Sequence, residues 1–131
     1  SMTNLVSNSG VVAADVTGVG QVRQSLAACA YGTDKAIFGY GYSYGNGPNQ
    51  SLTNLVSNSG VVATDTTGVG TARLYLAAAE YGTDKAIFGY GTTSAYAQAV
   101  GMTNLVSNSG VVASDTTGVG TVREKLAAAG Y

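Results

Sequence analysis

The stretch "TNLVSNSGVVA" occurs at residues 3–13, 53–63 and 103–113 with no residue changed. Working outward from it, residues 3–41 and 53–91 match at 31 of 39 positions. The following segments, 42–52 and 92–102, match at no position but have the same length. A repeat of 50 residues is typical of propellers, solenoids and arrays. We therefore interpret residues 1–131 as a single repeat domain with units 3–52, 53–102 and 103–131, of which the third is incomplete.

The composition excludes several classes of protein. Six basic and seven acidic residues leave no basic face for phosphate backbones, so we expect no nucleic-acid partner. No apolar run is long enough for a membrane helix, and no signal peptide is visible, so we expect a soluble protein that does not engage membranes. The sequence does not indicate a compartment. Apolar residues make up 45% of the chain, enough to build a folded core.

Glycines and β-branched residues predict strands rather than helices. Residues 53–65 form a predicted hairpin whose two-residue turn is Ser59-Gly60. Asp65 follows it, and we expect its side chain to bond locally to the turn backbone. "RLYLAAAEYG" (73–82) is the next predicted strand, although its alanine run could be helical, and "DKAIFGYG" (84–91) is the fourth. A sheet of four such strands must stack against neighbours to cover its faces.

The stretch "RLYLAAAEYGTDKAIFGYG" (73–91) resembles a kelch repeat. Arg73 occupies the arginine position at the start of the first strand, as Arg23 and Arg123 do in their units. "FGYG" at 38–41 and 88–91 lies where the family has a glycine doublet, here split by a tyrosine, and the family's tryptophan is missing. Repeats of the chromosome-condensation-regulator type are therefore a rival resemblance. Both imply an all-β fold, a β-propeller with blades of four antiparallel strands.

The number of blades implied by this resemblance predicts self-association. A propeller has about four to eight blades, whereas this chain provides about two and a half of them. Open sheet edges and apolar faces favour association. We therefore expect a homo-oligomer that completes the ring, with a dimer and six blades favoured. A fragment of a longer array is the alternative.

Catalytic chemistry finds little support in the sequence. There is no histidine and only one cysteine, which excludes histidine-based triads and zinc sites that use histidine or several cysteines. Cys29 has alanine at the matching positions 79 and 129, which favours a small packed residue over a reactive thiol. We expect no cofactor and no metal.

Two sets of charged residues recur at the repeat spacing. Asp15, Asp65 and Asp115 could supply calcium ligands, but the spacing of a calcium loop is missing, so turn capping is favoured. Arg23, Arg73 and Arg123 could line a channel and hold an anion. We favour a structural role between blades, in which each arginine binds backbone carbonyls or an aspartate.

The variable segments 42–52 and 92–102 are the candidate recognition surface. Tyrosine, serine, glycine and asparagine suit adaptable binding, while drift in unconstrained loops would explain the variation equally well. The candidate residues of this binding face are Tyr42, Tyr44, Asn46, Asn49, Thr92, Thr93, Tyr96 and Gln98.

These features together predict a non-catalytic binding or scaffold module with a protein or glycan partner. A purely structural assembly unit without a ligand is the alternative. A carbohydrate-active enzyme is a more distant one, because nothing in the sequence brings two carboxylates together in one place.

Overall fold

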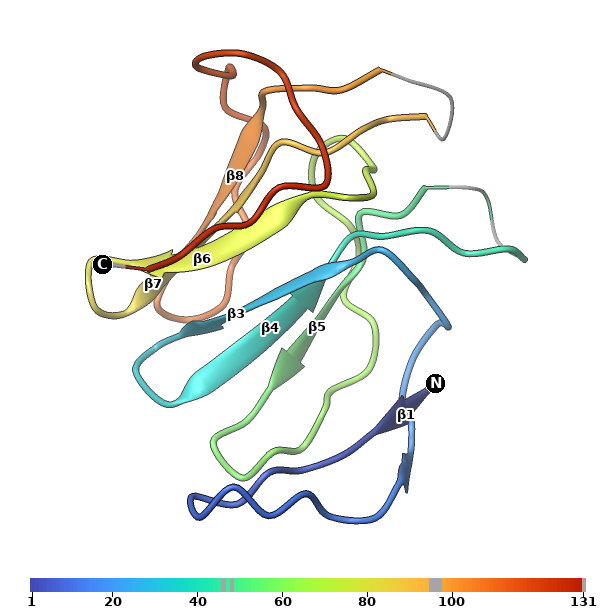
Figure 1. Cartoon of the computed structure of the whole chain (residues 1–131), viewed down its shortest axis with the longest axis vertical. Coiled ribbons are helices and arrows are strands. Elements are labelled where there is room, and N and C mark those ends of the chain that lie inside the picture. The colour runs from blue at the N-terminus through green and yellow to red at the C-terminus, as the bar shows by residue number, and fades with distance from the viewer. Residues whose placement is uncertain (46, 48, 95–97, 131) are drawn as a thin grey trace.

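The computed structural model describes residues 1–45, 47, 49–94 and 98–130, and these residues form strands, bridges and turns without a helix. The strands make three small antiparallel sheets with the orders β1–β2, β3–β4–β5 and β6–β7–β8, which follow one another along the molecule (Figure 1). The prediction of an all-β fold is therefore confirmed. The sheets do not close into a ring within the chain. The strands are β1 Met2–Thr3, β2 Val16–Thr17, β3 Ala27–Tyr31, β4 Lys35–Gly39, β5 Thr53–Val56, β6 Ala77–Tyr81, β7 Lys85–Gly89 and β8 Thr103–Val106.

Each three-stranded sheet spans the border between two sequence units. The alanine-rich segment forms β6, which pairs with β7 from Ala77 opposite Gly89 to Tyr81 opposite Lys85. The third strand, β8, belongs to the next unit and pairs with β7. The alanine run is thus a strand and not a helix. Tyr75, with φ of 55°, lies outside the helical region just before β6.

The hairpin expected at residues 53–65 is present, but its turn differs from the prediction. Val56 pairs with Val62, and the amide of Gly60 donates to the carbonyl of Ser57 at 2.9 Å. The turn is therefore centred on Asn58 and Ser59, and the prediction of a Ser59-Gly60 turn is wrong. Gly60 follows the turn with φ of 79°, a left-handed conformation that glycine adopts without strain.

The return strand of the predicted hairpin is reduced to bridges. Residues 62–66 pair with β5 through isolated bridges at Val62 and Thr66 and a hydrogen bond from the Ala63 amide to the Leu55 carbonyl at 2.8 Å, so the sheet has three continuous strands where four were predicted. The polar segment beyond the turn carries Ala63, Thr64 and Asp65, which are all exposed. It has no apolar side to bury, and a continuous strand there would gain little from packing.

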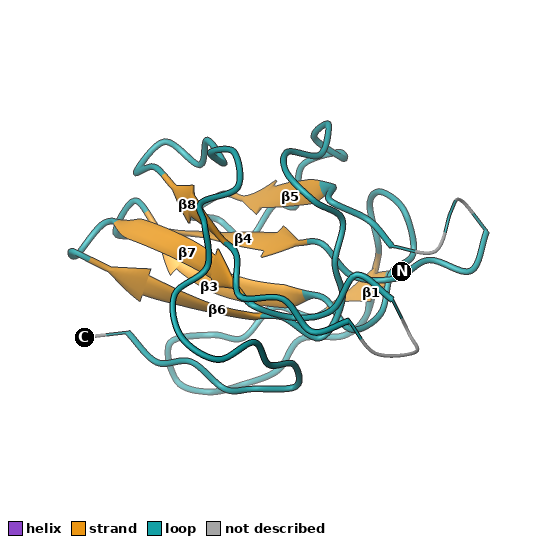
Figure 2. Cartoon of the chain, turned by 90° about the horizontal axis from the view of Figure 1, so that it is seen from above, coloured by secondary structure: helices purple, strands orange, loops and turns teal. Residues whose placement is uncertain are grey.

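The core lies where the sheet β6–β7–β8 stacks on the sheet β3–β4–β5, as the edge-on view shows (Figure 2). Phe88 is fully buried, and its ring lies over the backbone of Gly39. A Cβ atom on residue 39 would approach the Phe88 ring to 2.6 Å, so only glycine fits there. Tyr40 packs edge-on against Phe88 with 5.2 Å between ring centroids.

Identical residues of the repeat have different environments along the stack. Val6 is 64% exposed, while its counterpart Val106 is fully buried. Arg73 is fully buried, whereas Arg123 is exposed. The interface between the two larger sheets is therefore covered on both sides, and their outer faces are only partly covered.

Candidate functional site

The two variable segments lie at the same end of the sheets. They follow β4 and β7 and project away from the β3–β4 and β6–β7 turns in both views (Figures 1 and 2). The side-chain amide of Asn49 donates to the backbone carbonyl of Thr93 at 2.5 Å, which joins the two loops directly. We call the described part of residues 42–52 and 92–102 the loop face. Asn46 and Tyr96, two residues of the predicted binding face, lie outside the described residues.

A pocket with two tyrosines lies at the first loop. Tyr44 is 84% exposed, and its ring meets that of Tyr42 edge-on with 5.1 Å between centroids. The side-chain amide of Gln24 lies 3.3 Å from the Tyr44 hydroxyl. The cavity beside them has a volume of about 610 Å³ and is also lined by Arg23 and Asp65. Gln24 is not among the predicted residues of the binding face, although positions 24 and 74 differ between the copies.

The second loop is more closed. Thr92 is fully buried, and its hydroxyl lies 2.8 Å from the carbonyl oxygen of Ser94 and 3.0 Å from that of Gln98. Thr92 therefore supports the loop from inside and does not present its side chain to solvent. Thr93 is half-buried and contributes its carbonyl, while Gln98 is exposed.

A buried arginine cluster holds the sheets below the loop face. The Arg73 guanidinium is fully buried and lies 4.6 Å above the Tyr40 ring. Its Nη2 donates to Asn104 at 2.7 Å, and its Nη1 lies 3.5 Å from a carboxylate oxygen of Asp115. Burial lowers the pKa of Arg73, while Tyr40 and Asp115 act in the opposite direction. Burial also raises the pKa of Tyr40 to about 12. The cluster thus links both sheets through a desolvated charge.

Asp115 links the segment that precedes β6 to strand β8. It accepts hydrogen bonds from the Thr71 amide at 3.0 Å, the Thr71 hydroxyl at 2.6 Å and Asn104 at 2.8 Å. Partial burial alone would raise the pKa of Asp115. The bonds from Thr71 and Asn104, together with the Arg73 charge, outweigh it, and the pKa lies below the usual value.

The other two aspartates occupy the same place in less complete surroundings. Asp65 accepts from the Gln21 amide at 2.9 Å and from Asn54 at 2.8 Å. The prediction of a local turn bond for Asp65 is therefore wrong, because the backbone donor is 44 residues away. Asp15 accepts from Asn4 at 2.7 Å.

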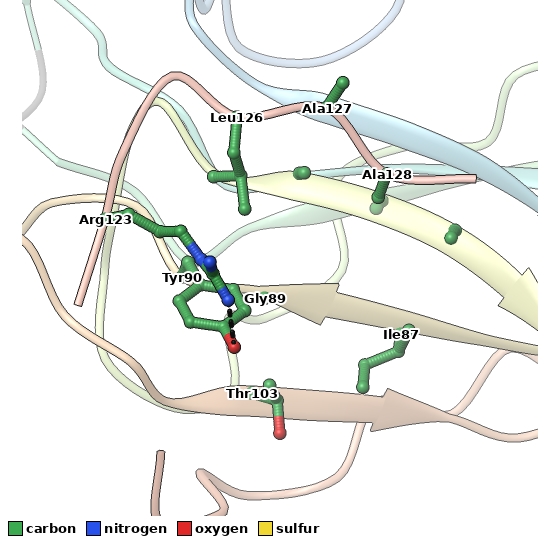
Figure 3. A pocket seen from close by; sticks show the side chains of 11 residues that line it. Ile87, Gly89, Tyr90, Thr103, Arg123, Leu126, Ala127 and Ala128 are labelled. Carbon is green, nitrogen blue, oxygen red and sulfur yellow. Dashed lines mark hydrogen bonds between the residues drawn. The ribbon is translucent and has the colours of Figure 1, made fainter. Parts of the chain in front are cut away.

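The outer arginines have only part of the Arg73 surroundings. Arg23 donates to the Leu52 carbonyl at 2.8 Å and to the Asn54 side chain. Burial lowers the pKa of Arg23, with nearby Asp65 opposing this. Arg123 lies 4.4 Å over the Tyr90 ring and donates to its hydroxyl at 2.9 Å (Figure 3). Sequence reasoning missed the asparagine and tyrosine partners. The invariant spacing of each asparagine from the aspartate of its hairpin was the available signal.

The site offers no grouping typical of metal chemistry. No three side chains of the metal-binding types His, Cys, Asp and Glu gather within the described part of the chain. Cys29 is half-buried on β3, and burial, followed by the charge of Glu80, raises the pKa of its thiol to about 11. A thiol with that pKa is almost entirely protonated at neutral pH and a weak nucleophile. No described residue belongs to a helix long and apolar enough to cross a membrane.

Comparison with protein-family models and with curated proteins found no match for this chain. The resemblance to kelch repeats, like its rival, therefore remains a prediction.

Proposed function

We propose that this chain is a non-catalytic recognition module that binds a protein or glycan partner on its loop face. The observation that carries the proposal is the junction of the two variable loops. The Asn49 bond to Thr93 unites them beside the pocket of Tyr42 and Tyr44. The nearly identical part of each repeat supports a role as a structural scaffold, and the variable part supports a role as a binding surface.

The chemistry of the pocket favours a polar partner of low charge. Tyr44 presents both an apolar ring and a hydroxyl, which gives contact area at a small entropic cost. Gln24 and Ser43 add neutral hydrogen-bonding groups, while Arg23 and Asp65 bring opposite charges to the same pocket. A sugar face or a polar protein loop matches this combination.

The sheets serve, in this proposal, as propeller blades of the kelch or chromosome-condensation-regulator type. About two and a half blades per chain lead to a ring completed by self-association. The stacked arrangement of β3–β4–β5 and β6–β7–β8 supports blade-like packing.

Binding to glycan and peptide arrays tests the loop face. We expect the wild type to select one class of ligand, and Tyr44→Ala to weaken that binding by about tenfold or more, because it removes the exposed ring. Val61→Thr, an exposed change on the hairpin, is the matched control. If the selected ligand bound equally well to Tyr44→Ala, the loop face would be the wrong surface. If neither array yielded a ligand, the purely structural unit would be the better interpretation.

A further inference from the structure

The interface between the two larger sheets contains one knob and one hole. Phe88 of β7 is the knob, and the bare backbone of Gly39 on β4 is the hole. Arg73 completes this contact above Tyr40, with its backbone carbonyl accepting from the Gly41 amide at 2.8 Å.

The outer face of β6–β7–β8 repeats the hole. A Cβ atom on Gly89, the counterpart of Gly39, would meet nothing closer than the Thr103 methyl group at 3.4 Å. A cavity of about 390 Å³ lies over this place, floored by Ile87 and the alanines of β6 and bordered by Tyr90 and Arg123 (Figure 3). Residues 126–128 of the C-terminal tail line its other side. The floor is apolar and the rim carries an aromatic ring, as at Gly39 and Tyr40.

The face of β3–β4–β5 that points away from this interface repeats the knob. Phe38 on β4 is the counterpart of Phe88, but it is only half-buried. It lines a second cavity together with Met2, Val22 and Leu26. Arg23 lies at the border of the same cavity, as Arg73 lies beside Phe88.

From these matching faces we propose that a second copy of the chain docks on the outer face of β6–β7–β8. Phe38 of the incoming copy packs over Gly89, and its Arg23 packs over Tyr90. The contact continues the stack with the same geometry that Phe88, Gly39, Arg73 and Tyr40 have inside one chain. The inference deepens the proposed self-association and rests on it, but it is independent of the ligand of the loop face.

Docking requires that two segments, one from each copy, are displaced, because both copies supply the same part of the repeat. Residues 101–131 of the receiving copy and 1–31 of the incoming copy are the same part of the repeat. The receiving hairpin holds fully buried Val106, whereas the incoming hairpin holds Val6, which is 64% exposed. The better-buried hairpin therefore stays, and residues 1–17 of the incoming copy are displaced.

The C-terminal tail of the receiving copy is displaced for the same reason, because it is the less buried of the two competing segments. Its residues 121–128 occupy the place that the start of a further sheet would take. The Arg123 carbonyl accepts a hydrogen bond from the Gly91 amide at 3.0 Å, as the Arg73 carbonyl does from the Gly41 amide. Most of this tail is exposed, whereas the incoming β3 contributes Ala27 and Tyr31 to a core. Each copy then adds two larger sheets to the assembly, so six sheets take three copies rather than the two favoured from the sequence.

Sedimentation velocity over a range of concentrations tests the junction. Gly89→Ala places a methyl group where the Phe38 ring of the partner must lie, and we expect association to weaken on the order of tenfold or more. The same change leaves the single chain undisturbed, because its Cβ has room there. Phe38→Ala should weaken association from the other side. Gly45→Ala, which has open space around it on the loop face, is the matched control.

A mixing experiment separates the junction from self-association in general. Gly89→Ala keeps the knob and Phe38→Ala keeps the hole, so an equimolar mixture should form a one-to-one dimer at concentrations at which neither variant associates alone. A thermal melt of each variant confirms that the monomer is folded. If the wild type stays monomeric at every concentration, both self-association and the junction are refuted. If it associates and Gly89→Ala has no effect, or the mixture does not pair, self-association stands and this junction is wrong.

Discussion

Arg73 and Arg123 have the same place in the repeat but opposite environments, and this contrast isolates what burial adds. Arg73 is fully buried between Tyr40, Asn104 and Asp115. Arg123 is exposed and stacks on Tyr90. The arginine and its asparagine and aspartate partners recur in all three units, but the sheets bury the arginine completely at Arg73 and not at Arg23 or Arg123.

Substituting the two arginines by alanine should therefore have unequal effects on stability. Arg73→Ala leaves Asn104 and Asp115 without their cation and opens a cavity, so we expect the free energy of unfolding to fall by about 3 kcal/mol. Arg123→Ala removes one exposed stacking contact and should reduce it by about 0.5–1 kcal/mol. Urea unfolding followed by tyrosine fluorescence measures both. Equal losses would contradict the role of burial at Arg73.

At the scale of the element, the three hairpin turns share one backbone shape and differ in what surrounds them. Gly10 and Gly110 have φ values of 79° and 81°. A Cβ atom on Gly10 would meet nothing within 4 Å, whereas one on Gly110 would lie 2.9 Å from Leu55 and 3.0 Å from the Tyr31 ring. The third turn packs on the neighbouring sheet, and the first does not.

Alanine substitution of these glycines separates backbone strain from packing. Gly10→Ala should lower the free energy of unfolding by about 1 kcal/mol, the usual penalty of a positive φ. Gly110→Ala should lower it by about 2–3 kcal/mol, because overpacking adds to the same strain. The comparison uses thermal or urea unfolding of both variants. A Gly110→Ala variant no less stable than Gly10→Ala would show that the third turn does not pack as described.

The strands were predictable from the sequence, but their partners were not. Alternation and glycine punctuation were sufficient to predict "DKAIFGYG" and the hairpin at 53–65, because these signals are local. The turn centre was missed because the Ser59-Gly60 pair was taken as the central residues, although Ser57 and Gly60 fit the first and fourth positions of a common turn. The asparagine partner of Arg73 was missed because Asn104 lies 31 residues away in the chain. For the loop face, the comparison between copies identified the segments, and only the fold placed Asn49 beside Thr93.

At the scale of the whole molecule, aspartates hold separate segments together and make the fold sensitive to acid. Asp34 has a lowered pKa because of hydrogen bonds from Lys35 and Asn58, and Asp84 because of those from Asn108 and Lys85. Asp115 has a lowered pKa as well, in partly buried surroundings. All three carboxylates are more acidic in the folded chain than an unfolded aspartate.

Stability should therefore decline when the solution is acidified. A carboxylate whose folded pKa lies below its unfolded pKa of about 3.9 stabilises the fold fully at neutral pH and loses this effect as the pH falls through the folded value. We expect the urea midpoint to drop below about pH 4. Asp115→Asn should be less stable than the wild type at neutral pH and lose less on acidification. If both proteins lost the same stability between neutral pH and pH 3, Asp115 would not contribute to the acid response.

The unchanged segment that appears in three places also affects how the chain reaches its fold. β4 pairs with residues 53–56, but residues 103–106 carry the same "TNLV" and would make the same ladder. Side chains cannot distinguish the two pairings, so the length of the intervening chain decides. The wrong partner closes a loop of residues 40–102 instead of 40–52, roughly five times longer, which costs about 1.4 kcal/mol more in chain entropy. Folding should thus begin with transient mispaired sheets in a minority of molecules, and a longer variable loop would make them more numerous.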